Sequence, residues 1–145
     1  MKIIIVSGYF NPLHGGHIDM IEAARAMGDR LVVIVNNDKQ QILKKGKIIL
    51  DEKNRLRLMR ALRDVDQVVL SIDEELPVIN TLEMVALQHP GDDIVFANGG
   101  DRNSQADIPE AKICQKYNII MRFDAGSGKP DSSSRINQET GHEIL

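Results

Sequence analysis

Short runs of apolar, mostly β-branched residues recur along the chain, and they constrain the fold more than any other feature. Continuous runs of this kind are typical of strands buried on both faces, as in a parallel sheet. Longer amphipathic stretches separate the runs, and right-handed helical crossovers connect parallel strands. The sequence therefore predicts a single-domain α/β protein with a Rossmann-like, three-layer α/β/α fold and a five-stranded parallel sheet. The predicted strands are Lys2–Ser7, Leu31–Val35, Gln67–Leu70, Ile94–Ala97 and Ile119–Phe123.

Helices are predicted between these strands from apolar periodicity and from end signals such as an N-cap Asp51. They are Ile18–Met27, Asp51 to about Arg63, about Pro77–Gln88, and a helix opened by Asp107 and Pro109 that ends near Tyr117. In the second helix the stripe expected to face the core is Leu58, Ala61, Leu62 and Val65. The segment Lys39–Leu50 is predicted to be a loop. We expect one domain over residues 1–138 and a polar tail over 139–145.

The composition excludes several classes of protein. The 145 residues contain 18 Lys and Arg against 21 Asp and Glu, a net charge of −3, whereas a nucleic-acid coat would carry a basic excess. A single cysteine, Cys114, excludes an internal disulfide framework, and its apolar neighbours predict a core position. The N-terminal apolar run is too short for a secretory signal, and no run of roughly eighteen apolar residues is present. We therefore expect a cytoplasmic protein that binds neither nucleic acid nor membrane.

The loop after the first strand carries the most specific pattern. From Ser7 to His17 it reads Ser-Gly-Tyr-Phe-Asn-Pro-Leu-His-Gly-Gly-His, so that His14 and His17 flank two glycines where a helix begins. A helix N-terminus presents unpaired N–H groups and about half a positive charge, which favours a phosphate. The alternative interpretation is a metal-binding or merely solvated histidine pair, although no carboxylate or cysteine lies in the loop to complete a metal site.

The segment Gly8–His17 resembles the signature of the HxGH nucleotidyltransferases, the cytidylyltransferase-like superfamily. Further segments in the expected order extend the resemblance over nearly the whole chain, and the branches that this chain resembles most are glycerol-3-phosphate cytidylyltransferases and heptose-1-phosphate adenylyltransferase domains. These segments are Gly28–Val33, Asn36–Asp38, Ala61–Asp66, Gly99–Asp101 and Asp131–Ile136.

The resemblance implies an enzyme that joins a nucleoside monophosphate from CTP or ATP to a small phosphorylated acceptor and releases pyrophosphate. The acceptor would be a polyol, sugar or amino-alcohol phosphate. Its phosphate is already ionised at neutral pH, so that catalysis consists of holding two anions together and stabilising charge on the α-phosphate. Mg²⁺ would accompany the triphosphate. We also expect a homodimer.

The resemblance also implies roles for particular residues. His17 would contact the α-phosphate, His14 the bridging and β-phosphate oxygens, and Lys44 or Lys45 the phosphates from the loop. Arg55, Arg63 and Arg102 would bind the acceptor. The expected nucleotide-binding residues are Gly8, Tyr9, Phe10, Asn11, Gly16, Gly99, Gly100, Asp101, Lys129, Ser132, Ser133 and Ser134.

Each of these assignments has a simpler alternative. The lysines are also compatible with a solvated basic loop, and the serines with an ordinary N-cap. Arg55 and Arg63 are also compatible with ion pairs to Asp51, Asp64 or Asp66. The run Gly126–Lys129 is not a P-loop, because Pro130 follows Lys129 where a serine or threonine is required.

Some positions depart from the family pattern and leave the substrate open. Asn11 replaces the aspartate that is usual in both branches, Ser127 stands where the glycerol-phosphate branch has an arginine, and Arg102 replaces an aromatic residue of the heptose branch. The last of these changes lies in a loop that the resemblance places at the base or the acceptor, so that it leaves the substrate open rather than the reaction type, and CTP and ATP both remain candidates. A rival hypothesis is a non-catalytic nucleotide-binding regulatory module of the same fold.

Overall fold

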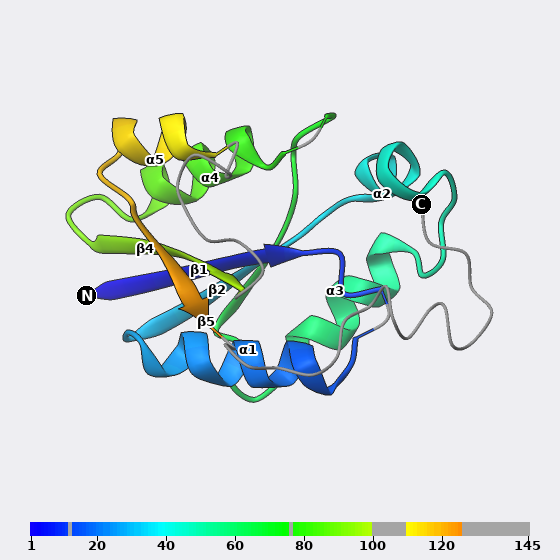
Figure 1. Ribbon diagram of the computed structural model, residues 1–145, viewed down its shortest axis with the longest axis horizontal. Helices are drawn as coiled ribbons and strands as arrows, with labels where there is room; N and C mark the ends of the chain where they lie inside the picture. Colours follow the sequence, from blue (N-terminus) through cyan, green and yellow to red (C-terminus); the bar gives the residue numbers. More distant parts are fainter. Residues whose placement is uncertain (12, 76, 100–109, 126–145) are drawn as a thin grey trace.

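The computed structural model describes residues 1–11, 13–75, 77–99 and 110–125, and these form a parallel five-stranded sheet in the order β3-β2-β1-β4-β5 (Figure 1). The strands are β1 (Lys2–Gly8), β2 (Arg30–Val35), β3 (Gln67–Leu70), β4 (Asp93–Gly99) and β5 (Ile120–Ala125). The helices are α1 (Gly15–Ala26), α2 (Asp38–Lys45), α3 (Glu52–Arg60), α4 (Ile79–Gln88) and α5 (Ala111–Lys116). The predicted sheet and fold class are confirmed.

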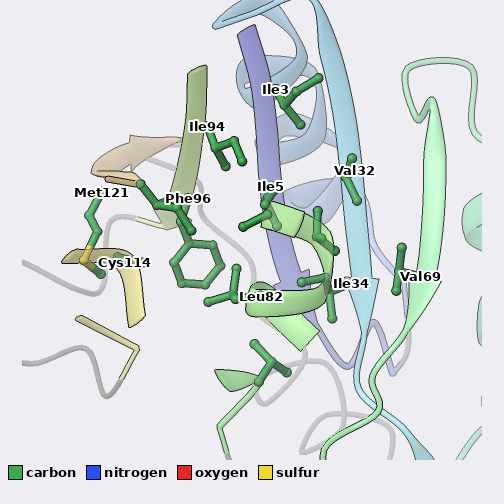
Figure 2. Close-up of a cluster of buried hydrophobic side chains, with 14 residues drawn as sticks. Ile3, Ile5, Val32, Ile34, Val69, Leu82, Ile94, Phe96, Cys114 and Met121 are labelled. Atoms are coloured by element: carbon green, nitrogen blue, oxygen red, sulfur yellow. The ribbon is translucent and has the colours of Figure 1, made fainter. Parts of the chain in front are cut away.

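Helices cover both faces of the sheet because successive side chains of a strand point to opposite sides. On β1, Ile3 and Ile5 pack with α4 and α5, and Figure 2 shows this cluster around Leu82, Phe96 and Cys114. Ile4 and Val6 pack on the other face, against buried side chains of α1 and α3. Cys114 is 1% exposed, which confirms its predicted place in the core.

Several predicted helix ends are displaced. α1 begins at Gly15 rather than Ile18, because His14 caps it, and α4 begins at Ile79 rather than near Pro77. Asp51 does cap α3, accepting a hydrogen bond from the Asn54 N–H at 2.9 Å, but this helix ends at Arg60. The predicted tail and the start of the fourth predicted helix lie outside the described residues.

The predicted core-facing stripe of the helix that became α3 is only partly right: Leu62 and Val65 pack against the core from beyond its last residue, whereas Leu58 and Ala61 are exposed. Leu58 is 43% exposed, whereas the inward side of the helix carries Arg55 and Met59, which are completely buried. Arg55 and Met59 are four residues apart and share one face. The long polar side chain of Arg55 occupies the place where a pattern of apolar residues was expected, because internal acceptors surround its guanidinium group.

The predicted loop Lys39–Leu50 is also wrong, because its residues 39–45 belong to α2. Asn37 and Gln40 form a capping box at its start, and Gly46 ends it in the left-handed conformation with φ 76°. The side chains that α2 buries are polar (Gln40, Gln41 and Lys45), while Ile42 and Leu43 are exposed. A helix with this reversed pattern has no apolar stripe from which it could be predicted.

Among the helices that the structure describes, none has both the length and the apolar character needed to cross a bilayer.

Candidate functional site

The predicted site lies beyond the carboxyl end of β1, at the centre of the sheet. From β1 the chain crosses to β2 on one side, whereas β4 joins β1 on the other side, so that the strand order reverses between β1 and β4. Parallel sheets bind ligands in the crevice at such a reversal. The loop from Tyr9 to His14 starts here and leads into α1.

Phe10 shapes this loop. It has a positive φ of 53° and is 3% exposed, so that its ring turns back into the molecule. A Cβ atom on Gly8 would lie 3.1 Å from Cζ of Phe10, which explains the glycine at this position. The ring also meets His17 edge-on, with centroids 5.1 Å apart and an interplanar angle of 71°. Phe10 therefore positions His17 from the side.

His14 and His17 are tied together by the first turn of α1. Nδ1 of His14 accepts a hydrogen bond from the Gly16 N–H at 3.0 Å, and Nδ1 of His17 accepts one from the His14 N–H at 3.3 Å. The two rings stack with centroids 3.8 Å apart and an interplanar angle of 24°. An Nδ1 atom that accepts a hydrogen bond carries no proton, so that each neutral ring is protonated at Nε2. The capping bonds thus make Nε2–H the donor of each neutral ring, and Nε2 of His14 is itself buried.

A buried network of amide groups and one arginine holds the loop against α2 and α3. The Asn11 side-chain amide donates to Oε1 of Gln41, and both side chains have no exposed surface. Oε1 of Gln41 also accepts the Ile49 N–H. An asparagine rather than an aspartate at position 11 fits this network, because the shared Gln41 oxygen requires donors.

Arg55 is the centre of this network. Its side chain has no exposed surface, and its N–H groups donate to the backbone carbonyl oxygens of Leu50, Tyr9 and Asn36. It also forms a hydrogen-bonded ion pair with Asp38 at 2.9 Å. In this conformation Arg55 joins the ends of β1 and β2 to α2, and its predicted role in binding the acceptor stays a prediction. The ion pair is with Asp38, which was not among the expected partners.

Tyr9 lies between the loop and the lysines of α2. The ammonium nitrogens of Lys44 and Lys45 lie 5.0 and 5.6 Å from the centroid of its ring. Lys45 is 6% exposed, so it is not part of a solvated basic loop, whereas Lys44 is exposed. Burial lowers the pKa of Lys45, and the positive charges of Lys44 and Arg55 lower it further. Burial raises the pKa of Tyr9 to about 12, against a smaller opposing effect of Arg55.

The structure does not bring all expected residues together. Arg63 is 89% exposed and pairs with Asp64 at 3.8 Å, one of the partners that were expected as an alternative. Gly99 is the last residue of β4, which places it at the same edge of the sheet as Gly8. The remaining expected residues lie outside the described residues: Gly100, Asp101, Arg102, Lys129, Ser132, Ser133 and Ser134.

A pocket of about 580 Å³ lies elsewhere, in the connection between β3 and α4. None of the expected site residues lines it, and its wall carries the carboxylates of Asp73, Glu74 and Glu75. Such a wall would repel a phosphate, so the loop after β1 remains the better candidate site. Within the described ranges no group of three or more His, Cys, Asp or Glu side chains could hold a metal ion.

The chain is similar to known proteins over most of its length. The cytidylyltransferase-like family model matches residues 5–139. The chain is 40% identical over 134 residues to the bifunctional protein HldE of Methylobacillus flagellatus, covering 91% of this chain and 26% of that protein. It is 38% identical over 76 residues to an FAD synthase of Ferroglobus placidus, covering 52% of this chain and 49% of the synthase. The chain thus spans about a quarter of the HldE protein and about half of the synthase.

Solved structures show the same fold. A lipopolysaccharide core biosynthesis protein from Thermoplasma volcanium superimposes with a TM-score of 0.66 and 29% identity, over 86% of this chain and 98% of that one. A nicotinate-nucleotide adenylyltransferase from Vibrio parahaemolyticus, described in its structure as putative, superimposes with a TM-score of 0.64 at 22% identity, over 98% and 83% of the two chains.

Proposed function

This chain belongs to the cytidylyltransferase-like family, and from that premise we propose that it is a nucleotidyltransferase. It transfers a nucleoside monophosphate from CTP or ATP to a small phosphorylated acceptor and releases pyrophosphate. The acceptor is a polyol, sugar or amino-alcohol phosphate. An acceptor phosphate oxygen forms the new bond to the α-phosphorus while the bond from that phosphorus to the bridging oxygen of pyrophosphate breaks, so that no general base is required.

The mutual capping of His14 and His17 is the observation that carries this proposal. Two imidazoles held as Nε2–H donors at a helix N-terminus suit an α-phosphate whose oxygens gain negative charge during transfer. His17 donates to the α-phosphate, and His14 to the bridging and β-phosphate oxygens. Phe10 and the backbone bonds hold both rings before substrate binds, so that little reorganisation is needed.

Mg²⁺ enters as part of the nucleotide substrate. The described residues offer no cluster that could hold a metal by itself, and Mg²⁺ commonly binds to the phosphates and water with only one or two carboxylates. The buried Lys45 and its neighbour Lys44 supply further positive charge for the phosphates. A metal site formed by His14 and His17 is the weaker alternative, because both Nδ1 atoms already accept backbone hydrogen bonds.

The first experiment measures thermal stability with each of the four NTPs in the presence of Mg²⁺. A ligand at about 100 times its Kd stabilises the native state by roughly 2.7 kcal/mol, which raises the midpoint by several degrees. We expect either CTP or ATP to give this shift. The nucleotide that does so is then incubated with a panel of polyol, sugar and amino-alcohol phosphates, and pyrophosphate release is measured.

Two outcomes separate the proposal from its rival. Pyrophosphate release that depends on one acceptor identifies a transferase, whereas a stability shift with no turnover on the whole panel favours the non-catalytic nucleotide-binding module. Stabilisation by Zn²⁺ and by no nucleotide would overturn both in favour of a metal site. Size-exclusion chromatography with light scattering tests the homodimer that we also propose.

A further inference from the structure

The chain contains two tyrosines, and each lies against lysine side chains. The two contacts have similar geometry, since Nζ of Lys116 lies 5.4 Å from the ring centroid of Tyr117 and the lysines of α2 lie 5.0 and 5.6 Å from that of Tyr9. They differ in the charges around them. The Tyr117 contact therefore serves as an internal reference for the Tyr9 contact.

At Tyr117 the lysine charge is balanced. Glu83 lies 3.5 Å from Nζ of Lys116 and also accepts the Tyr117 hydroxyl at 2.8 Å. Lys116 is 65% exposed, so water also solvates its ammonium group. This is an ordinary surface cluster in which the ring adds little, because exposed ion pairs and exposed cation–π contacts contribute about 1 kcal/mol or less.

At Tyr9 the lysine charge is not balanced. Within the part of the chain that the structure describes, no carboxylate lies within ion-pair distance of Lys44 or Lys45, and Lys45 is buried. The charge of Arg55, which also acts on Lys45, is likewise positive and is engaged with Asp38. A buried ammonium without a carboxylate is costly unless another partner is supplied. The face of the Tyr9 ring is such a partner, and it stabilises part of the ammonium charge.

The ring itself is fixed at both ends. The Tyr9 hydroxyl donates to the carbonyl oxygen of Gln40 at 3.4 Å, which ties the ring to α2. The Tyr9 carbonyl accepts a hydrogen bond from Arg55 at 3.1 Å, which ties its backbone to α3. Tyr9 therefore connects the loop that holds the histidines to the helix that holds the lysines.

We propose that Tyr9 is a positioning residue, whose ring holds the Lys44 and Lys45 ammonium groups together and uncompensated so that they receive a phosphate group of the substrate as a pair. This inference rests on the proposed function. It adds the side chain of Tyr9 to a site in which histidines and lysines supply the charge. It also explains why Lys45 is buried. A lysine that only attracted the substrate phosphate by its charge could be exposed to solvent.

The test measures the Kd of inorganic pyrophosphate by titration calorimetry for the wild type and for Tyr9→Phe, Tyr9→Leu and Tyr117→Leu. Phenylalanine keeps the ring face, whereas leucine keeps apolar bulk without it. Two cation–π contacts of about 0.5–1 kcal/mol each correspond to a five- to thirtyfold weakening for Tyr9→Leu. Tyr9→Phe is expected to stay within about twofold of the wild type, and Tyr117→Leu to bind unchanged.

A pH profile separates positioning from a general structural role. Binding of pyrophosphate falls as Lys45 loses its proton, and burial places the pKa of Lys45 below its usual value. In Tyr9→Leu the apolar bulk remains but the ring face that favours the charged ammonium group is lost, so that this alkaline limb moves to lower pH. Pyrophosphate and the charged groups of Lys44, Arg55 and Asp38 are present in both proteins, whereas the Tyr9 hydroxyl, whose pKa burial raises to about 12, is absent from the variant. Lys45→Ala is expected to remove the limb.

Each remaining outcome overturns the inference. Equal binding by Tyr9→Leu would show that the ring is dispensable, and equal losses in Tyr9→Phe and Tyr9→Leu would assign the effect to the hydroxyl group. Weaker binding with an unmoved limb would indicate general damage to the loop, which the midpoint of thermal unfolding without ligand would register. If the wild type binds neither pyrophosphate nor any NTP, the proposed function fails and this inference fails with it.

Discussion

His14 and His17 stabilise the same helix turn that presents them, because each ring accepts a backbone N–H through Nδ1. The same bonds that cap α1 thus determine which nitrogen of each ring carries a proton. The first turn of α1 and the orientation of the two histidine rings therefore form together when the chain folds. A substitution at either histidine therefore has two consequences, one for stability and one for chemistry, and these need to be measured separately.

We expect His14→Asn to separate the two. Asparagine is among the best N-cap residues, so the free energy of unfolding should change by less than about 1 kcal/mol. The Nε2–H donor is lost, and removal of one such donor typically lowers kcat by about 10²–10³. Urea unfolding and pyrophosphate release measure the two effects. A variant that retains full activity would show that His14 is a capping residue only.

Gly8→Ala is expected to act on His17 through Phe10. The new Cβ would lie 3.1–3.4 Å from three atoms of the Phe10 ring, so that the ring must shift by a few tenths of an ångström. Crowding of this kind costs about 1–3 kcal/mol of stability. Because the ring contacts His17, we expect kcat to fall about tenfold. Gly15→Ala is the control for stability, since a Cβ there meets nothing within 4 Å.

Removal of Arg55 is expected to destabilise the whole site. Arg55→Met removes the arginine donor from the carbonyl groups of Tyr9 and Asn36, and it leaves Asp38 and the Leu50 carbonyl group with only the Gln41 amide, which lowers the free energy of unfolding by about 3–5 kcal/mol. Arg55→Lys restores the charge but not the planar array of donors, so that it rescues only part of the loss. Urea unfolding measures both. The exposed Arg57→Met on the same helix should stay within about 0.5 kcal/mol of the wild type.

Stability is expected to fall at alkaline pH because of Cys114. Burial, with a smaller effect of the nearby Glu110, raises the pKa of its thiol from 9.0 to about 11. Above the lower value the unfolded thiol ionises while the native thiol keeps its proton, so that rising pH favours unfolding. The loss amounts to about 2 kcal/mol between pH 9 and 11.

Urea unfolding at several pH values, compared with Cys114→Ala, isolates this contribution. The variant is less stable throughout but should lose less stability over this interval. Tyr9, whose pKa is raised to about 12, acts with the same sign above its ordinary value of 10.0. Lys45 acts with the opposite sign, because its lowered pKa means that rising pH relieves the cost of burying its charge. Identical pH slopes in both proteins would contradict the assignment to Cys114.

The strands could be predicted because the signal for them is local. Ile3, Ile4, Ile5 and Val6 are all buried because helices cover both sides of β1, and a run of β-branched residues is the pattern that such a strand requires. The Gly8–His17 segment is equally local, since the turn, the cap and the two histidines lie within one short stretch.

α2 could not be predicted from apolar periodicity, although its end signals were present. Asn37 and Gln40 form a capping box and Gly46 is a favourable residue for ending a helix, and these three positions could have revealed it. Its inward-facing side chains are polar because their partners lie outside the hydrophobic core: Gln40 and Gln41 donate to backbone carbonyl groups, and Lys45 lies over the Tyr9 ring.

The parallel sheet, the helices that cover it and the position of the histidine motif all follow from patterns between near neighbours in the chain. Which polar side chains are buried, and what they bind, depends instead on how the folded chain brings distant residues together. Arg55 reaches the carbonyl oxygen of Tyr9, 46 residues earlier in the chain, and Tyr9 in turn meets the lysines of α2. Burial of a polar group is favourable only when its partners are in place, and those partners are brought together by the fold.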